Sequence, residues 1–117
     1  MIFSRRHLLA GAAALAVLPR HAFAAAADEA EGLLALLPDR TAAAKLGESW
    51  VQQEHPQAQA VLQKLRNLLP DGNAMKLREV IAEDFRAGAV VKVEGWQIAR
   101  TQAELCALAY FATTGKL

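Results

Sequence analysis

The fold is decided by one stretch late in the sequence, residues 90–112, which reads VVKVEGWQIARTQAELCALAYFA. From Val91 to Ile98 its apolar residues have strand spacing on either side of Glu94-Gly95, which favours a β-hairpin. A two-residue turn at Glu94-Gly95 places Val93 opposite Trp96. It also places Val91 opposite Ile98, so the apolar side chains share one face. Because a lone hairpin is barely stable in water, we expect this face to pack on helices.

The second half of the same stretch predicts a helix. Thr101 and Glu104 have the spacing of a capping box, in which the Thr101 side chain accepts from the N–H of Glu104 and the Glu104 carboxylate reaches back. The residues that follow, 105–112, carry no charge. A helix that is apolar all round is buried on all sides or meets a partner. If it meets a partner or a ligand, the expected contact residues are Trp96, Leu105, Leu108, Tyr110 and Phe111.

Helical spacing also occurs upstream of the hairpin, in residues 29–37, 42–53, 57–69 and 74–87. Asp39 or Thr41 is expected to cap the second of these helices, and Asn73 the fourth. Gly88 is expected to end the fourth helix in a left-handed conformation. We therefore predict a mainly α fold, a small helical bundle of about five helices with one short β-hairpin before the last helix.

Two of these helices carry specific packing predictions. Gly47 lies in the middle of a helix, where glycine costs about 1 kcal/mol relative to alanine, and we expect another helix to approach closely there. In the helix over residues 74–87, helical spacing predicts one buried stripe. That stripe consists of Leu77, Val80, Ile81 and Phe85.

Composition bounds the size and the partners of the domain. We expect residues 1–24 to be a leader and residues 25–117 to form a single small domain. The leader holds three of the 13 basic residues and none of the 12 acidic ones, so the remaining chain has two more acids than bases. A slightly acidic domain without a basic cluster is poorly suited to bind nucleic acid or an anionic membrane surface. We therefore predict no nucleic-acid partner.

Few residues beyond the leader can carry chemistry. His55 is the single histidine there, Ser49 the single serine, and Cys106 the only cysteine of the chain. One Cys and one His cannot complete a four-ligand zinc site, and a lone Cys forms no internal disulfide. Ser49 lies in no nucleophile-elbow motif, and His55 has no second histidine or nucleophile at a recognisable spacing. We therefore predict a protein that is not an enzyme, with no metal and no cofactor.

Two other groups have a structural and a chemical interpretation. A Cys106 thiol inside an apolar helix is expected to pack as a small hydrophobe with a raised pKa. The alternative is a reactive or intermolecularly bridged thiol. Glu83 and Asp84 would form a paired-carboxylate site only if they faced each other, but adjacent helical residues point about 100° apart. A solvated helix face is the favoured interpretation.

Residues 1–24 have the pattern of an export signal. Arg5 and Arg6 precede an apolar run of 11 residues, and Ala22 and Ala24 are the small residues of a signal-peptidase site. A membrane span needs about 20 apolar residues, so we expect cleavage after Ala24 and no stable membrane anchor.

The leader resembles a twin-arginine (Tat) translocation signal. Such signals have a Ser/Thr-Arg-Arg-x-apolar-Leu core, which Ser4, Arg5, Arg6, Leu8 and Leu9 match here. The resemblance implies a bacterial protein that the twin-arginine translocase exports already folded, often with a cofactor or a bound partner. The mature chain would then be periplasmic after signal peptidase acts. The alternative is a general secretory signal that happens to contain two arginines.

The part of the chain from Asp84 to Leu108 resembles the C-terminal part of a group of short Tat-signal proteins of unassigned function. That resemblance implies no activity. In organisation, a small chain with such a leader and no cofactor site is similar to the small subunits of periplasmic dehydrogenases, which are exported with a catalytic subunit that lacks its own signal. No functional residue carries over from either resemblance.

Two functions are therefore predicted. The first is an exported, non-enzymatic accessory or escort subunit that binds a larger periplasmic, redox protein. The alternative is a stand-alone periplasmic domain that binds a small apolar ligand between the helices and the hairpin, with Trp50 or Trp96 in the pocket. A third hypothesis, an enzyme that uses His55 and a carboxylate, has no further residues to support it.

Overall fold

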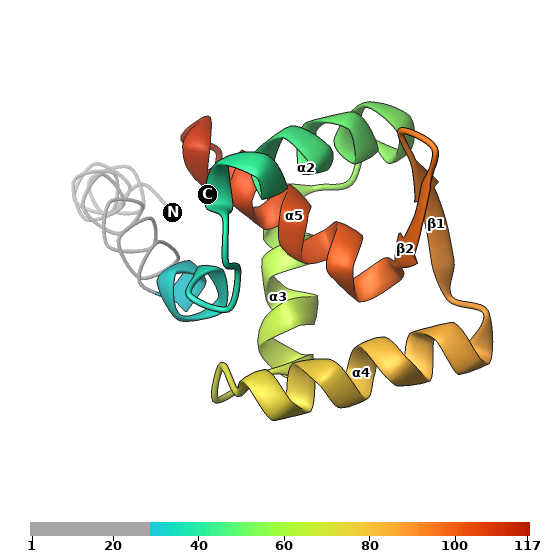
Figure 1. The fold of residues 1–117 in the computed structure, drawn as a ribbon. Coiled ribbons are helices and arrows are strands. Elements are labelled where there is room, and N and C mark those ends of the chain that lie inside the picture. The colour runs from blue at the N-terminus through green and yellow to red at the C-terminus, as the bar shows by residue number, and fades with distance from the viewer. Residues whose placement is uncertain (1–28) are drawn as a thin grey trace, which may run out of the picture.

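The computed structural model describes residues 29–117 (Figure 1). A helical segment at residues 29–34 is followed by elements in this order: α2 (Arg40–Glu54), α3 (Ala58–Leu68), α4 (Ala74–Ala87), β1 (Val90–Val93), β2 (Trp96–Ala99) and α5 (Arg100–Thr113). The predicted fold class, mainly α with one hairpin before the last helix, is confirmed. The predicted leader residues lie outside the described residues, namely Ser4, Arg5, Arg6, Leu8, Leu9, Ala22 and Ala24.

The local signals that bound the helices act largely as expected. Asp39 caps α2, since its Oδ1 accepts from the N–H of Ala42 at 3.1 Å. Asn73 caps α4 by accepting from the N–H of Met75 at 2.8 Å. Gly88 ends α4 at φ 75°, a left-handed conformation that glycine adopts without a steric penalty. Short polar side chains and one glycine therefore set these boundaries before any tertiary contact is considered.

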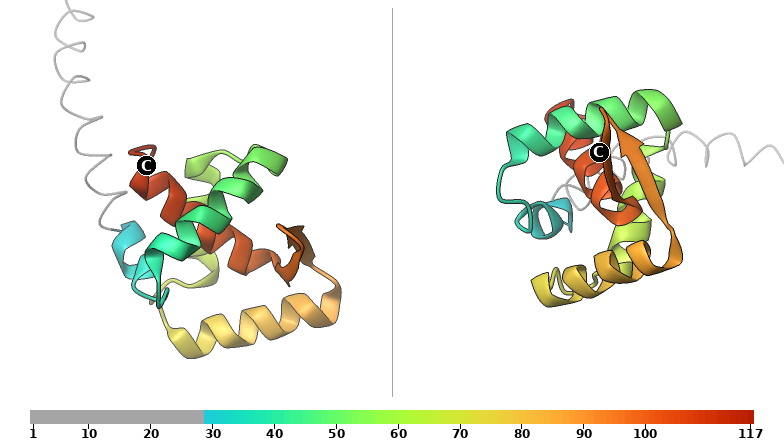
Figure 2. Two further views of the ribbon diagram at one scale, coloured as in Figure 1. Left: turned by 45° about the horizontal axis from the view of Figure 1, so that its top comes forward. Right: turned by 45° about the vertical axis from the view of Figure 1, so that its right-hand side comes forward.

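Helix α5 lies at the centre of the fold, with α2 and α3 packed against it and α4 and the hairpin beside it (Figures 1 and 2). Nine of its residues are buried, including Leu105, Leu108 and Phe111. The absence of charge from residues 105–112 is therefore explained by burial inside this chain. Within residues 29–117 no helix is long and apolar enough to cross a membrane.

Helices α2 and α5 approach each other closely at Gly47 of α2. A Cβ atom placed on Gly47 would lie 2.7 Å from the backbone nitrogen of Ala107, and closer still to the carbonyl group of Cys106. Atoms this near would overlap, so α2 and α5 can meet here only because position 47 has no side chain. The predicted close approach of another helix over Gly47 is confirmed.

The hairpin has the predicted register. Val93 pairs with Trp96 and Val91 with Ile98 in an antiparallel ladder. Glu94 (φ 50°) and Gly95 (φ 84°) both have positive φ, as a tight two-residue hairpin turn of the I′ kind requires. The Ser49 hydroxyl donates to the Glu94 carboxylate and so holds the turn against α2.

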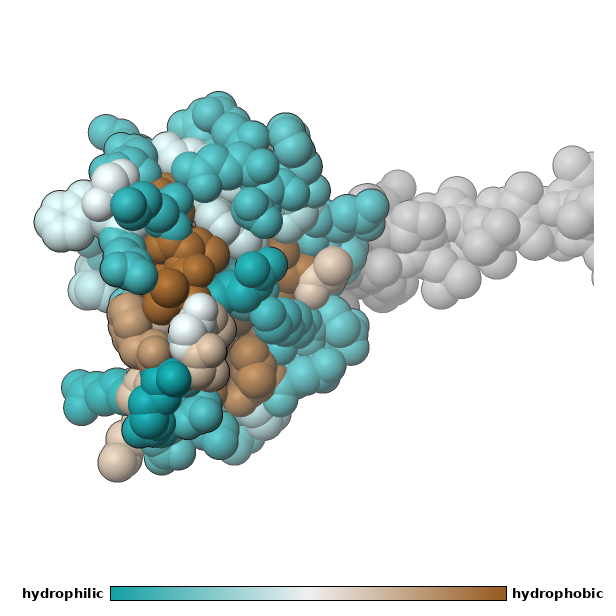
Figure 3. Space-filling model, turned by 90° about the vertical axis from the view of Figure 1, so that its right-hand side faces the viewer, coloured by the Kyte–Doolittle hydropathy of each residue, from teal (hydrophilic) through white to brown (hydrophobic). Residues whose placement is uncertain are grey.

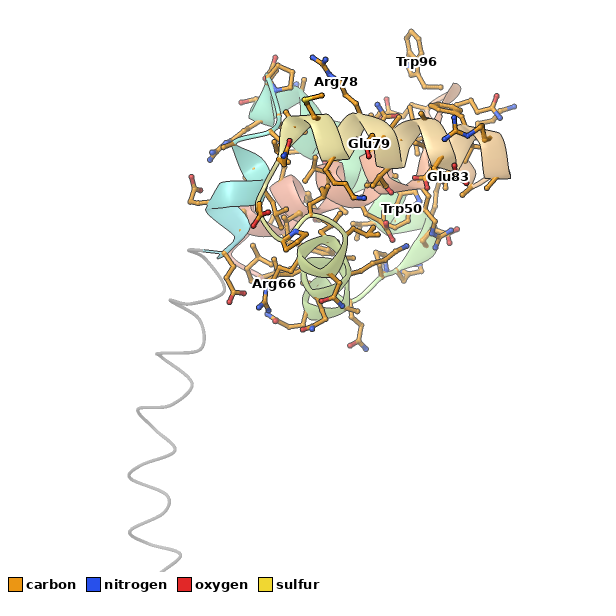
Figure 4. The ribbon with its side chains drawn as sticks, turned by 90° about the horizontal axis from the view of Figure 1, so that it is seen from below. Trp50, Arg66, Arg78, Glu79, Glu83 and Trp96 are labelled. Atoms are coloured by element: carbon orange, nitrogen blue, oxygen red, sulfur yellow. The ribbon has the colours of Figure 1, made fainter. Side chains whose placement is uncertain are left out.

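The prediction that the whole apolar face of the hairpin packs on helices is only partly right. Val93 is fully buried, but Trp96 is 68% exposed. Trp96 pairs directly with Val93 across the ladder, yet the helices cover only Val93. In Figure 4 its ring projects away from the body of the molecule.

The predicted capping box at Thr101 is wrong. Helix α5 begins at Arg100, directly after the strand, where the N–H of Arg100 still donates to the carbonyl of Ala89 at 2.9 Å. The cap is therefore displaced toward the N-terminus, and Gln102 Oε1 accepts from the N–H of Ala99 at 2.9 Å. The N–H of Thr101 donates instead to Asp84 Oδ2 of α4, also at 2.9 Å.

The predicted buried stripe of α4 is only partly right. Leu77 and Val80 pack against the core, but no residue of α4 is fully buried. Leu77, Val80 and Ile81 are half-buried, and Phe85 is 49% exposed. The reason is the position of α4, which runs along one edge of the molecule and makes its main contacts with α5 and β2 (Figure 1).

Substitution of Gly47 by alanine tests the α2–α5 approach. The new methyl group would overlap the α5 backbone, which cannot move aside as a flexible side chain can. We expect Gly47→Ala to lower the free energy of unfolding by about 1–3 kcal/mol, the usual cost of overpacking. Urea denaturation followed by circular dichroism measures it. Gly32→Ala is the control, since a Cβ there meets no atom within 4 Å. Equal midpoints for the two variants would contradict this packing.

Removal of the Asp84 carboxylate tests the link between α4 and α5. Asp84→Ala would leave the N–H of Thr101 without its charged acceptor. We expect a loss of about 1–2 kcal/mol in the free energy of unfolding. Its neighbour provides the control, because Glu83 forms only an exposed pair with Arg86. Glu83→Ala is expected to change stability by no more than about 0.5 kcal/mol. An unchanged Asp84→Ala midpoint would refute the link.

Candidate functional site

The residues predicted to contact a partner are divided by the structure into two groups. Leu105, Leu108 and Phe111 are buried in the core of this chain, and Leu108 has no exposed surface at all. They fill the space between α5 and its neighbours and present no surface to another molecule. Tyr110 is half-buried at the rim of α5, and Trp96 is exposed. Of the five residues, Trp96 is the one that projects into solvent.

Trp96 is one of three large apolar side chains that are exposed in the described chain. The large hydrophobic side chains most exposed in residues 29–117 are Met75 (69%), Trp96 (68%) and Phe85 (49%). Two of them come from α4 and one from β2, and these elements are in contact. Figure 3 shows hydrophobic side chains gathered on the side of the molecule formed by the hairpin and α4, with hydrophilic residues around them.

The α4 residues of this region follow one side of the helix. Arg78, Ala82 and Phe85 follow Met75 by three, seven and ten positions. At about 100° of rotation per residue, the four side chains project to the same side of the helix. All four are exposed. In Figure 4, Arg78 and Trp96 point to the same side of the molecule. We call the five residues Met75, Arg78, Ala82, Phe85 and Trp96 the α4–hairpin surface.

Arg78 is the single charge on this surface. The ion pairs formed within residues 29–117 involve Arg40, Lys64, Arg66, Arg86 and Arg100, and none of them includes Arg78. Glu79 borders this surface at helical spacing from Met75 and Ala82, but Figure 4 shows it pointing in a different direction from Arg78. Glu83 pairs with Arg86 at 2.8 Å. The α4–hairpin surface therefore combines apolar side chains with one guanidinium that has no carboxylate partner in the described chain.

A buried charge cluster lies elsewhere, where α2, α3 and α5 meet. Glu104 is 4% exposed, and its Oε2 lies 2.8 Å from Lys64 Nζ and 3.8 Å from Arg100 Nε. The Arg100 guanidinium carbon is 5.9 Å from the ring centroid of Trp50, which is also buried. Burial of a charge is tolerated when it is paired, and the Lys64 pair connects α3 to α5. The contacts of this cluster therefore connect α2, α3 and α5 to one another.

The residues considered for catalysis have structural roles. Ser49 holds the hairpin turn through Glu94. His55 is exposed, and in left-handed conformation (φ 52°) it ends α2, with its N–H donating to the carbonyl of Val51. Asp84 bonds to the start of α5 while Glu83 pairs with Arg86, so the two carboxylates do not act together. Among residues 29–117 no group of three His, Cys, Asp or Glu side chains is placed to hold a metal ion.

Cys106 is a buried thiol on α5. Burial disfavours the charged thiolate and raises the pKa of Cys106 from 9.0 to about 11. Its carbonyl group is also the one that meets Gly47 of α2. Because the thiolate is the reactive species, this environment makes the side chain inert near neutral pH.

Two open cavities on the described chain were considered as ligand sites. One of about 410 Å³ lies between the segment at residues 29–34 and the end of α3, and it is lined by Glu29, Arg66 and Asp71 among others. Arg66 and Glu29 pair across it at 3.1 Å. A second, of about 240 Å³, lies between α2 and Tyr110. Neither Trp50 nor Trp96 lines either cavity.

Comparisons of the chain with protein-family models, with curated proteins and with solved structures find no match.

The sequence prediction includes Trp96 but omits Met75, Arg78 and Ala82. Helical spacing does contain a signal for them, since Met75 and Ala82 share a side of the helix with Phe85. Whether that side or the Leu77 side faces the core depends on how α4 docks, which spacing does not determine. The Lys64 partner of Glu104 had no local signal, because Lys64 is 40 positions away.

The raised pKa of Cys106 predicts a pH dependence of stability. Between about pH 9 and pH 11 the unfolded chain ionises its thiol while the folded chain keeps the proton. The unfolded state then binds fewer protons, so stability falls as pH rises. Relative to Cys106→Ala, we expect the wild-type chain to lose up to ~2 kcal/mol across this range. Urea denaturation at a series of pH values tests this, and parallel profiles for the two chains would contradict it.

Proposed function

We propose that the protein is an exported, non-enzymatic accessory subunit that binds a larger periplasmic, redox protein and escorts it through the export pathway. The observation that carries the proposal is the α4–hairpin surface. Phe85 and Met75 on α4 and Trp96 on β2 are exposed apolar side chains. Figure 3 shows apolar residues gathered on the side of the molecule formed by the hairpin and α4. Contiguous apolar surface rimmed by polar residues is typical of protein–protein interaction sites.

The kinds of residue on this surface support a protein partner. Trp and Arg are the residues most often found to dominate binding energy at interfaces, and Met and Phe are enriched there. The elements that carry them are held in place by hydrogen bonds, from Thr101 to Asp84 and from Ser49 to Glu94. A surface held in this way loses little conformational entropy on binding.

The leader supports the escort part of the proposal. Its resemblance to twin-arginine signals implies transport of a folded protein. A small domain without a cofactor has no evident need of that route for itself, whereas a larger partner bound to its surface would need it. The α4–hairpin surface now takes the role for which the apolar residues of α5 were first considered.

The alternative function is a stand-alone domain that binds a small apolar ligand. It draws less support, since Trp50 is buried against Arg100 and Trp96 is in solvent. Neither tryptophan lines the cavity of about 410 Å³ or the cavity beside Tyr110. A screen of apolar ligands followed by tryptophan fluorescence would favour it if Trp50 emission changed on addition of a ligand, with Trp96→Phe used to isolate the Trp50 signal.

Replacement of Arg5 and Arg6 by lysine tests the escort function. The double variant is expected to remain in the cytoplasm, because twin-arginine signals depend on both guanidinium groups. Under the proposal a second protein also fails to reach the periplasm. Quantitative comparison of periplasmic fractions from cells that carry the wild-type or the variant chain measures both effects.

Arg20→Lys is the matched control, since Arg20 is a basic leader residue outside the motif. It should leave export of both proteins intact. Retention of the double variant with every other periplasmic protein unchanged would show that the chain travels alone.

A further inference from the structure

We infer that the α4–hairpin surface binds an apolar segment of the larger partner that carries a carboxylate, and that this carboxylate pairs with Arg78. The inference rests on the proposed function and names the surface and the partner chemistry that the function requires. It is argued from the apolar residues of the surface and from the absence of a carboxylate partner for Arg78 within residues 29–117.

The composition of the surface limits what can cover it. On its α4 side Met75, Ala82 and Phe85 are apolar, so the covering segment must itself be largely apolar for the contact to exclude water. Arg78 lies between Met75 and Ala82 along the same side of the helix. Any molecule that covers these two residues therefore also covers the Arg78 guanidinium.

A covered guanidinium needs a partner. Loss of water from a charge is costly unless an opposite charge or hydrogen-bond acceptors replace it. No carboxylate within residues 29–117 pairs with Arg78. The acceptor must come from the covering molecule, and a carboxylate matches the fork of guanidinium donors in two parallel hydrogen bonds. The chemistry of the surface thus points to an Asp or Glu within an apolar segment.

A second copy of this chain does not meet this requirement. In a two-fold symmetric contact the same surface faces itself. The α4–hairpin surface contains a cation and no carboxylate, so a symmetric contact centred on it would bring two Arg78 guanidinium groups together. A different protein that supplies the carboxylate avoids this repulsion.

The experiment uses the full chain with a C-terminal affinity tag, expressed in its native cells and recovered from the periplasm. The protein that it retains is identified and quantified by mass spectrometry. Phe85→Ser removes the aromatic anchor, and Arg78→Glu reverses the charge. Both residues are exposed, so both variants are expected to fold, which circular dichroism verifies. Each is expected to reduce the retained partner by about tenfold or more.

Lys45→Glu is the matched control for the charge reversal. Lys45 is exposed on α2, a helix that lies on the opposite side of the molecule from α4 in Figure 1. It forms no ion pair within the described chain. It should retain the partner at the wild-type level. In the identified partner, replacement of the contacting Asp or Glu by Arg should then restore binding to Arg78→Glu and weaken binding to the wild-type chain.

The possible failures are distinct. If the wild-type chain retains a partner and both Phe85→Ser and Arg78→Glu retain it equally well, this inference is wrong and the accessory function stands. If Phe85→Ser loses the partner but Arg78→Glu does not, the inferred pairing of a partner carboxylate with Arg78 is wrong. If the wild-type chain retains nothing, or only further copies of itself, the accessory function fails and this inference fails with it.

Discussion

The contact between Gly47 and the α5 backbone is the constraint on which the rest of the fold depends. It sets the distance between α2 and α5, and with it the depth of the core that Trp50 and Leu108 fill. Once α5 lies this close to α2, one side of it is covered by backbone rather than by long side chains. Other sides of α5 contact α3 and the hairpin. Lys64 of α3 pairs with Glu104 of α5, and Val93 of the hairpin belongs to the same core.

Little apolar surface of α5 remains for α4 to cover. Helix α4 is held near its end by the Asp84–Thr101 hydrogen bond and by the short connection to β1, while none of its side chains is fully buried. A helix attached in this way keeps its apolar residues partly in water, which is unfavourable for an isolated domain and useful for one that binds a partner. The same arrangement explains why Phe85 and Met75 are exposed.

The fold was largely predictable from the sequence because local chemistry determines much of it. The Asn73 and Gly88 boundaries and the Glu94-Gly95 turn were each sufficient for a correct prediction. The absence of charge from residues 105–112 left burial and partner contact as alternatives, and the structure shows burial. The predictions that failed are those for which the local sequence allowed two structures equally well. Thr101 was a plausible cap, but strand pairing continues to Ala99 and Gln102 takes the role. The spacing of α4 suited two sides of the helix, and only tertiary packing decides between them. For the same reason Trp96 is the only residue of the α4–hairpin surface that the sequence analysis names as a contact candidate.

The central position of α5 has a consequence for the chain during synthesis. Helices α2, α3 and α4 all precede α5 in the sequence, yet the side chains of α2 and α3 are buried mainly against it. While residues 100–113 are still inside the ribosome, the emerged part lacks the helix that completes its core, so it cannot reach the native state. The α4–hairpin surface is therefore assembled only after translation has passed residue 113. A partner that recognises it would meet a finished domain and never a nascent one.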